Sequence, residues 1–271
     1  MNVKRTAMLW AGLALSGAVA AATQAAPAAA AKLSSTKEIR SCMSDNLVRR
    51  AALRDLTLGV YDKEGKIRDL KLKLYWKPSG SGGTRVLLRL IEPVAMAGSS
   101  YLLIQEGAQE EVFFALPGAD RALRITGQNM SEPLWGTDFS YGEIKQVLGL
   151  LVTGDTSRGA DATVSGRNSW VLETQTSAAE TGYRKVVSYV DQATCVLLKS
   201  EFVATGDKPR KVLEGDVSLL LQADKYWTIL GYKMVDNARG TYTTLALSDL
   251  AIDERLSEKL FSPKEFFDFK P

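Results

Sequence analysis

Apolar and polar residues alternate along much of the chain, most clearly over residues 66–77. One face of this segment carries Leu70, Leu72, Leu74 and Trp76, and the other face carries lysines and a tyrosine. A period of two is typical of a half-buried β-strand. Similar runs predict strands over residues 85–91, 100–106, 111–116, 122–126, 169–174, 183–190, 196–204, 211–220, 226–235 and 241–247. Turns rich in Gly, Asp, Asn and Pro separate these runs, so we predict a mainly β protein built from antiparallel strands.

Helical periodicity occurs in few places. Ser35 and Glu38 have the spacing of a capping box, and the apolar residues that follow recur at helical spacing over residues 36–51, with Cys42 on the buried face. Two further helical segments are predicted over residues 141–152 and 253–260. Because no long helices alternate with the strands, the pattern favours a curved sheet, a sandwich or a barrel.

Three of the predicted strands, 85–91, 100–106 and 111–116, are apolar on both faces. Such strands are typical of a sandwich, and they also suit a sheet wrapped around an open apolar cavity with helices as a lid. Alternation alone does not separate these two folds. The cavity interpretation predicts a lining formed by Leu72, Leu74, Trp76, Leu88, Leu90, Leu102, Ile104 and Phe113, with Met96 and Trp135 near the mouth.

The N-terminal residues have the composition of an export signal. Lys4 and Arg5 precede an apolar run over residues 7–20, and Ala/Pro-rich sequence with several small-x-small sites follows. The run is too short and too rich in alanine for a membrane-spanning helix. We therefore predict a signal peptide and leader over residues 1–31 and a single periplasmic domain over residues 32–271. An uncleaved amphipathic anchor is the alternative.

Charge and composition exclude several classes of function. Cleavage removes two basic residues and no acid, which lowers the formal net charge from +3 to +1, so a nucleic-acid partner is not expected. The chain contains no histidine, which excludes Ser-His-Asp and Cys-His catalysis and histidine-based metal sites. A glycosidase built from two distant carboxylates stays open in principle. We expect no enzyme activity, no cofactor and no metal.

The two cysteines, Cys42 and Cys195, are predicted to enter a compartment that permits disulfides. A bond between them would tie the first helix to the middle of the sheet. Two unpaired buried thiols are the alternative, and we favour the disulfide.

Several segments resemble a known family. From about residue 36 to the C-terminus the chain resembles the outer-membrane lipoprotein-sorting protein-like family, relatives of the LolA and LolB lipoprotein carriers. The segment 134–141 is the most specific, because it is close to the family's Gly-Thr-Asp-Phe-Ser/Thr-Tyr signature. The other segments that carry the resemblance are residues 89–103, 113–127, 195–202 and 260–263.

The resemblance implies an open antiparallel half-barrel whose apolar concave face is covered by helices. It also implies a monomeric carrier of a lipid or lipidated protein between the inner and outer membranes, associated with an inner-membrane lipid-exporting permease. The cargo could be a lipoprotein, a phospholipid, a hopanoid-like lipid or another lipid. The arginine that usually precedes the loop glycine of the family is absent, because Ala97 precedes Gly98 here, so a cargo contact by that arginine does not transfer. A regulatory or sensor module on the same fold is the alternative.

The signature itself has a physical interpretation. Gly136 permits a tight turn, and Asp138 can accept hydrogen bonds from backbone amides at the start of the next helix. Phe139 and Tyr141 would then hold that helix against the sheet, with Thr137 inside the turn. We therefore expect a structural clamp or hinge, and direct contact with a ligand is the alternative.

Overall fold

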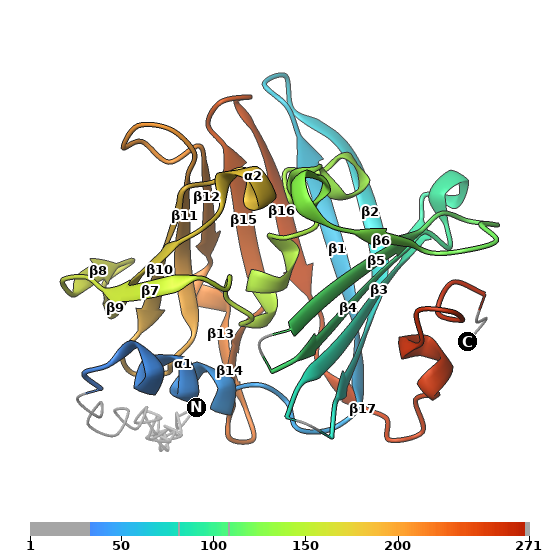
Figure 1. Ribbon diagram of the computed structural model, residues 1–271, viewed down its shortest axis with the longest axis horizontal. Helices are drawn as coiled ribbons and strands as arrows, with labels where there is room; N and C mark the ends of the chain where they lie inside the picture. Colours follow the sequence, from blue (N-terminus) through green and yellow to red (C-terminus); the bar gives the residue numbers. More distant parts are fainter. Residues whose placement is uncertain (1–32, 81, 108, 269–271) are drawn as a thin grey trace, which may run out of the picture.

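The computed structural model describes residues 33–80, 82–107 and 109–268, so the predicted signal peptide and leader over residues 1–31 lie outside the described residues. In this part of the chain, fifteen strands form one antiparallel sheet that curves without closing (Figure 1). The first strands are β1 (Ala52–Tyr61), β2 (Lys66–Pro78), β3 (Thr84–Glu92), β4 (Ser100–Glu106), β5 (Gln109–Ala115), β6 (Leu123–Ile125), β7 (Asp155–Arg158) and β8 (Ala162–Val164). The later strands are β9 (Arg167–Gln175), β10 (Lys185–Asp191), β11 (Leu197–Val203), β12 (Lys211–Gly215), β15 (Gly231–Asp236), β16 (Thr241–Leu247) and β17 (Ala251–Ile252). The predicted open half-barrel is confirmed.

The sheet consists of two halves that meet at one central pair of strands. One half runs β6-β5-β4-β3-β2-β1, and the other runs β16-β15-β12-β11-β10-β9-β7. At the junction, Leu56 of β1 faces Leu247 of β16 and Leu58 faces Leu245. A separate hairpin of β13 (Leu220–Ala223) and β14 (Tyr226–Ile229) lies at one end of the sheet.

Helix α1 (Thr36–Asp45) crosses the same end of the molecule as this hairpin (Figure 1). Its capping box is present: the backbone N–H of Glu38 donates to Ser35 Oγ at 3.2 Å, and that of Ser35 donates to the Glu38 carboxylate at 2.9 Å. The backbone N–H groups of Ser35 and Ser34 lower the pKa of Glu38 to about 2. The helix ends at Asp45, with Asn46 as its C-cap, and is shorter than predicted because the chain must turn there to enter β1.

A long connection over residues 127–150 crosses the inner face between the two halves of the sheet (Figure 1). It is built from the single turns η2 (Gly127–Ser131), η3 (Leu134–Gly136) and η4 (Ile144–Leu148). The helix predicted over residues 141–152 is therefore only one 3₁₀ turn, which Gly149 ends in the left-handed conformation with φ 80°. The remaining short helical turns are η1 (Val94–Met96), α2 (Ala178–Thr181), η5 (Val217–Leu219) and η6 (Glu258–Phe261).

The two apolar faces of the sheet are buried in different ways. The inner face packs against α1 and the 127–150 connection and holds most of the buried side chains, including Leu70, Leu72, Phe139 and Val147. The outer face of β2, β3 and β4 packs against the C-terminal segment through a smaller cluster that includes Tyr75, Leu87, Phe261 and Phe266. The two-sided apolar strands thus have a cover on each side, and neither cover in the described residues is the second sheet of a sandwich.

The prediction of which side chains of β4 and β5 lie on the inner face of the sheet is wrong. Leu102, Ile104 and Phe113 belong to the outer cluster, away from the inner face for which they were predicted. The register explains this, because Leu102 pairs with Leu87 of β3 and with Phe113 of β5, all on the outer face. Their neighbours Tyr101, Leu103 and Phe114 point inward instead. Strands that are apolar on both sides carry no alternation from which to choose the face.

Strand boundaries differ from prediction in the C-terminal half. The run predicted over residues 211–220 stops at Gly215, and the run predicted over 226–235 is divided between β14 and β15 at Leu230. β1 was not predicted at all, although it lies at the centre of the sheet. Among the described residues no helix has the length and apolar character needed to cross a membrane.

Candidate ligand-binding site

A cavity of about 420 Å³ opens at the end of the half-barrel where α1 and the β13–β14 hairpin lie. Its inner wall comes from strands of both halves of the sheet and from the η4 turn. The apolar residues of this wall include Leu74, Trp76, Val147, Leu148, Val196 and Leu197. The rim is formed by the hairpin and by two short segments, one after α1 (Asn46, Leu47, Val48 and Arg50) and one near the C-terminus (Asp249, Leu250 and Ile252).

The rim is tied together by several long-range contacts. A disulfide joins Cys42 of α1 to Cys195, with their Cα atoms 5.7 Å apart, which confirms the predicted bond. The Asn46 side chain donates to the carbonyl of Thr194 and accepts from the backbone N–H of Trp227 at 3.0 Å. These contacts join α1 to the segment before β11 through a covalent bond and to the hairpin through one hydrogen bond.

The segment between α1 and β1 is also held by Trp76, which lies in the part of the cavity wall formed by β2. The indole Nε1 of Trp76 donates to the carbonyl of Val48 at 2.8 Å. A buried tryptophan needs such a partner for its N–H, and its ring supplies apolar area to the wall. Trp76 therefore forms the wall and also anchors the rim.

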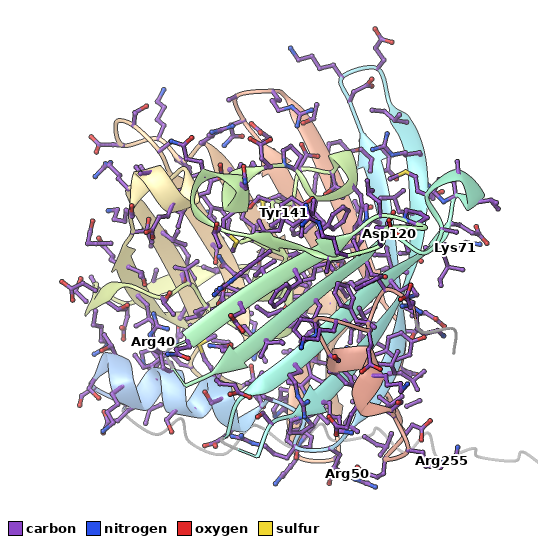
Figure 2. All side chains as sticks on the ribbon, turned by 45° about the vertical axis from the view of Figure 1, so that its right-hand side comes forward. Arg40, Arg50, Lys71, Asp120, Tyr141 and Arg255 are labelled. Atoms are coloured by element: carbon purple, nitrogen blue, oxygen red, sulfur yellow. A yellow bond between two sulfur atoms is a disulfide. The ribbon has the colours of Figure 1, made fainter. Side chains whose placement is uncertain are left out.

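One charged side chain projects from β1 into this apolar site. Arg54 lines the cavity and is 9% exposed, and burial lowers its pKa, while nearby Asp249 and Tyr232 act in the opposite direction. Tyr232 also lines the cavity, and burial raises the pKa of its hydroxyl. The exposed rim arginine, Arg50 (Figure 2), instead pairs with Glu254 at 2.7 Å. The cavity thus combines a large apolar wall with a single buried cation.

The signature over residues 136–141 lies inside the half-barrel, where Tyr141 is seen between the two halves of the sheet (Figure 2). Asp138 accepts hydrogen bonds from the hydroxyls of Thr241 and Thr243 on β16, the latter at 2.7 Å. Phe139 is fully buried in the inner cluster. The signature therefore clamps the inner connection to the centre of the sheet.

The predicted capping role of Asp138 is wrong. The backbone N–H of Ser140 donates to Glu143 at 2.7 Å, so Glu143 serves the turn that Asp138 was expected to cap. Glu143 was available for this role because it follows Ser140 by three residues, the spacing of a capping box. Gly136 does take the expected positive φ of 66°, and a Cβ there would meet the Arg68 guanidinium at 2.8 Å.

A buried ion pair fixes the same connection to β12. Lys211 Nζ lies 3.0 Å from Glu143 Oε2, and it donates to the carbonyl of Asp138 at 2.7 Å. The Tyr183 hydroxyl donates to the other oxygen of Glu143, and burial together with that carboxylate raises the pKa of Tyr183 far above its ordinary value. This network is enclosed by protein on all sides, which favours a structural role.

A protein family described only as uncharacterized matches residues 82–266, about two thirds of the chain. The chain belongs to this family. No curated protein matches its sequence.

Several solved structures have a fold similar to that of this chain. A domain described as an outer membrane lipoprotein-sorting protein from Vibrio parahaemolyticus is 22% identical, covers 86% of this chain and 97% of its own, and has a TM-score of 0.73. A DUF1329 family protein from Desulfovibrio piger is 19% identical, with 83% and 95% coverage and a TM-score of 0.71. A LolA superfamily protein from Nitrosomonas europaea is 16% identical, with 85% and 98% coverage and a TM-score of 0.64. The resemblance to lipoprotein-sorting proteins is confirmed at the level of the fold, which is similar to that of these three proteins.

The predicted lining residues are distributed unevenly over the fold. Leu74 and Trp76 line the cavity. Leu72, Leu88, Leu90 and Trp135 lie in the packed inner cluster, and Met96 contacts it, but these residues do not line the cavity. The inner face at β2 and β3 is therefore filled by the 127–150 connection, and open space is found toward α1.

Several cavity residues were missed from the sequence. Val147 and Leu148 were read only as one face of a helix, and the hairpin residue Trp227 had no assigned role. Arg54 had a usable signal, because it shares a period of two with Leu56 and Leu58, which predicts an inward position. In the described part of the chain no group of three or more His, Cys, Asp or Glu side chains is placed to hold a metal ion.

We expect Asp138→Ala to lower the free energy of unfolding by about 2 kcal/mol, because two hydrogen bonds to a carboxylate disappear and the Thr243 hydroxyl loses its acceptor. Asp138→Asn, which keeps the shape and one acceptor oxygen, should lose less. Urea unfolding followed by tryptophan fluorescence measures both. If Asp138→Ala kept full stability and lost fatty-acid binding, the residue would be a ligand contact instead of a clamp.

Proposed function

We propose that the protein is a periplasmic carrier that moves a lipid or lipidated protein between the inner and outer membranes. The cavity at the α1 end would hold the acyl or polycyclic part of the cargo. The observation that supports this most directly is the apolar wall that includes Leu74, Trp76 and Val147, open to the surface between α1 and the hairpin. An exported carrier also agrees with the predicted signal peptide and with the disulfide.

The size and chemistry of the cavity suit a hydrocarbon chain. Its volume of about 420 Å³ falls within the range of roughly 300–1,000 Å³ that is typical of small-molecule sites. Each methylene moved from water to such a wall contributes about 0.8 kcal/mol, or about fourfold in affinity. A chain of moderate length would therefore bind tightly without any polar contact.

A large lipid needs space to enter, and the mouth is built from elements that can separate. The hairpin of β13 and β14 is a sheet of its own, linked to α1 through Asn46. We propose that the hairpin moves away from α1 to admit cargo, and that a lipid-exporting permease of the inner membrane supplies it. The domain that does this would be the whole of residues 32–271, acting as a monomer without catalysis.

The proposal is tested by the dependence of affinity on chain length. We expect the affinity of the delipidated protein for saturated fatty acids to rise by about fourfold per methylene until the cavity is full, and then to stay constant. The variant Leu47→Trp/Leu148→Trp fills space at two half-buried lining positions, so its plateau should begin at a shorter chain. Calorimetry over the series measures both plateaus.

The matched control is Leu116→Trp/Leu123→Trp, which changes two exposed leucines on β6 and the loop before it. This variant should keep the plateau of the unchanged protein. Absence of fatty-acid binding in the unchanged protein, together with a stable protein partner and no lipid after purification from periplasm, would replace the carrier by a sensor module.

A further inference from the structure

Arg54 is buried in the candidate site without a hydrogen-bond partner among the described residues. It is 9% exposed, and its Nε is fully buried with no hydrogen bond in the described residues. No carboxylate of the described residues lies within 4.0 Å of its guanidinium, and Asp249, the acid that influences it, is exposed. An arginine keeps its charge at every physiological pH, so a cation faces the cavity unpaired.

The other buried arginine of the described chain shows what a structural arginine looks like here. Arg89, on the outer side of β3, donates to Ser100 Oγ at 3.2 Å and to the carbonyl of Phe266. The half-buried Arg68 likewise donates to the carbonyls of Trp135 and Gly136. Arg54 is nearly as buried as Arg89, but in the described residues it makes no hydrogen bonds like those of Arg89 and Arg68.

An unpaired buried charge has an unfavourable free energy, because the guanidinium loses its hydration and has no anion beside it. Its planar donor fork matches a carboxylate or phosphate group, which it binds through two parallel hydrogen bonds. Tyr232 lies close enough to Arg54 to affect its charge, and its hydroxyl makes no hydrogen bond with another described residue. It provides a further donor beside the arginine.

The position of Arg54 relative to the apolar wall defines the shape of a ligand. Arg54 on β1 pairs directly with Leu74 on β2, and Leu74 belongs to the apolar lining. A molecule that lies along Leu74 and Trp76 would therefore place one end beside the guanidinium. The exposed carboxylates of Asp224 and Asp249 lie in the solvated part of the lining, where water screens them.

We infer that the cavity selects an anionic amphiphile, a hydrocarbon chain with a carboxylate or phosphate head, and that Arg54 binds the anionic oxygens of that head. This inference rests on the proposed carrier function and adds the chemical class of the cargo. A neutral lipid of the same length would fit the wall and leave the arginine unpaired.

The test compares amphiphiles that carry different head groups on the same hydrocarbon chain. Dodecanoate, dodecyl phosphate and dodecanol are titrated into the delipidated protein below their micelle concentrations, at a pH well above the pKa of the fatty acid. We expect both anions to bind at least about tenfold more tightly than the alcohol, as a hydrogen bond to a charged group implies. Acetate and inorganic phosphate, the free anions, should neither bind measurably nor displace dodecanoate.

Variants assign the preference to a residue. Arg54→Met should abolish the difference in affinity between the two anions and dodecanol, and Arg54→Lys should retain part of the preference. Arg49→Met is the control for net charge, because Arg49 is exposed at the same end of the molecule and should keep the full preference.

Each outcome has a definite meaning. If the unchanged protein binds none of the three amphiphiles, the carrier proposal itself fails. If it binds all three equally, the carrier proposal stands and the anionic cargo is overturned, a result that needs no variant. A preference that survives in Arg54→Met overturns the role of Arg54, and binding of the free anions alone would show an ion site unrelated to lipid.

Discussion

Lys211→Met is expected to lower the free energy of unfolding by about 3–5 kcal/mol, because it leaves the Glu143 carboxylate buried without its cation. Both side chains are at most 6% exposed, and Lys211 also satisfies the carbonyl of Asp138. Few other single changes should affect the fold as strongly, since the variant loses both the charge and the link between β12 and the inner connection. Urea unfolding measures the loss.

Two further variants make this expectation specific. Lys211→Met/Glu143→Gln should be more stable than Lys211→Met alone, because the neutral amide no longer needs a cation while it still accepts from Tyr183. Lys199→Met removes a pair with Glu201 whose side chains are 25% and 23% exposed, so it should cost less than about 1 kcal/mol. A loss below 1 kcal/mol in Lys211→Met would show that water reaches Glu143.

Removal of the disulfide is expected to lower stability by about 4 kcal/mol and the melting temperature by about 10 °C. The bond closes a loop with a sequence separation of 153, so it strongly restricts the unfolded chain. Cys42→Ala/Cys195→Ala is the variant, and scanning calorimetry with and without reductant is the measurement. Reductant should lower the melting temperature of the unchanged protein and leave the melting temperature of the variant unchanged.

The same bond predicts a local effect at the mouth. Without it, α1 keeps the Asn46 contacts and the hydrogen bonds of Arg40 but loses its covalent link, so backbone amides of residues 36–45 should exchange faster with deuterium than in the bonded protein. Thiol titration of the denatured, unreduced protein should find no free cysteine. Two free thiols in protein prepared from periplasm would contradict the disulfide in the natural protein.

The sequence allowed the fold class to be predicted because most strands alternate. Where alternation was missing, prediction of the buried face failed, as for Leu102 and Phe113, since only pairing with β3 and the C-terminal cover decides which side they occupy. β1 was overlooked although Leu56, Leu58 and Val60 alternate and Arg54 shares their period of two.

The cavity could be predicted only in part, for a different reason. Leu74 and Trp76 are set by one strand, but the opposite wall comes from η4, from β11 and from the hairpin, which are far apart in sequence. The partners of Asp138 and Glu143 are likewise distant, on β16 and β12. No local pattern identifies such pairs, so the contacts of Asp138 were assigned wrongly.

The pairing of β1 with β16 has a consequence for how the chain reaches this fold. Each half of the sheet consists largely of neighbouring strands that follow one another in the chain, so each can form from local contacts. The seam between the halves must wait for the last long strand, because Leu56 meets Leu247 only there. Contacts between such distant residues slow folding. An exported chain would therefore pass through a stage in which both half-sheets have formed but β1 and β16 are not yet paired. At that stage it would most need protection from aggregation.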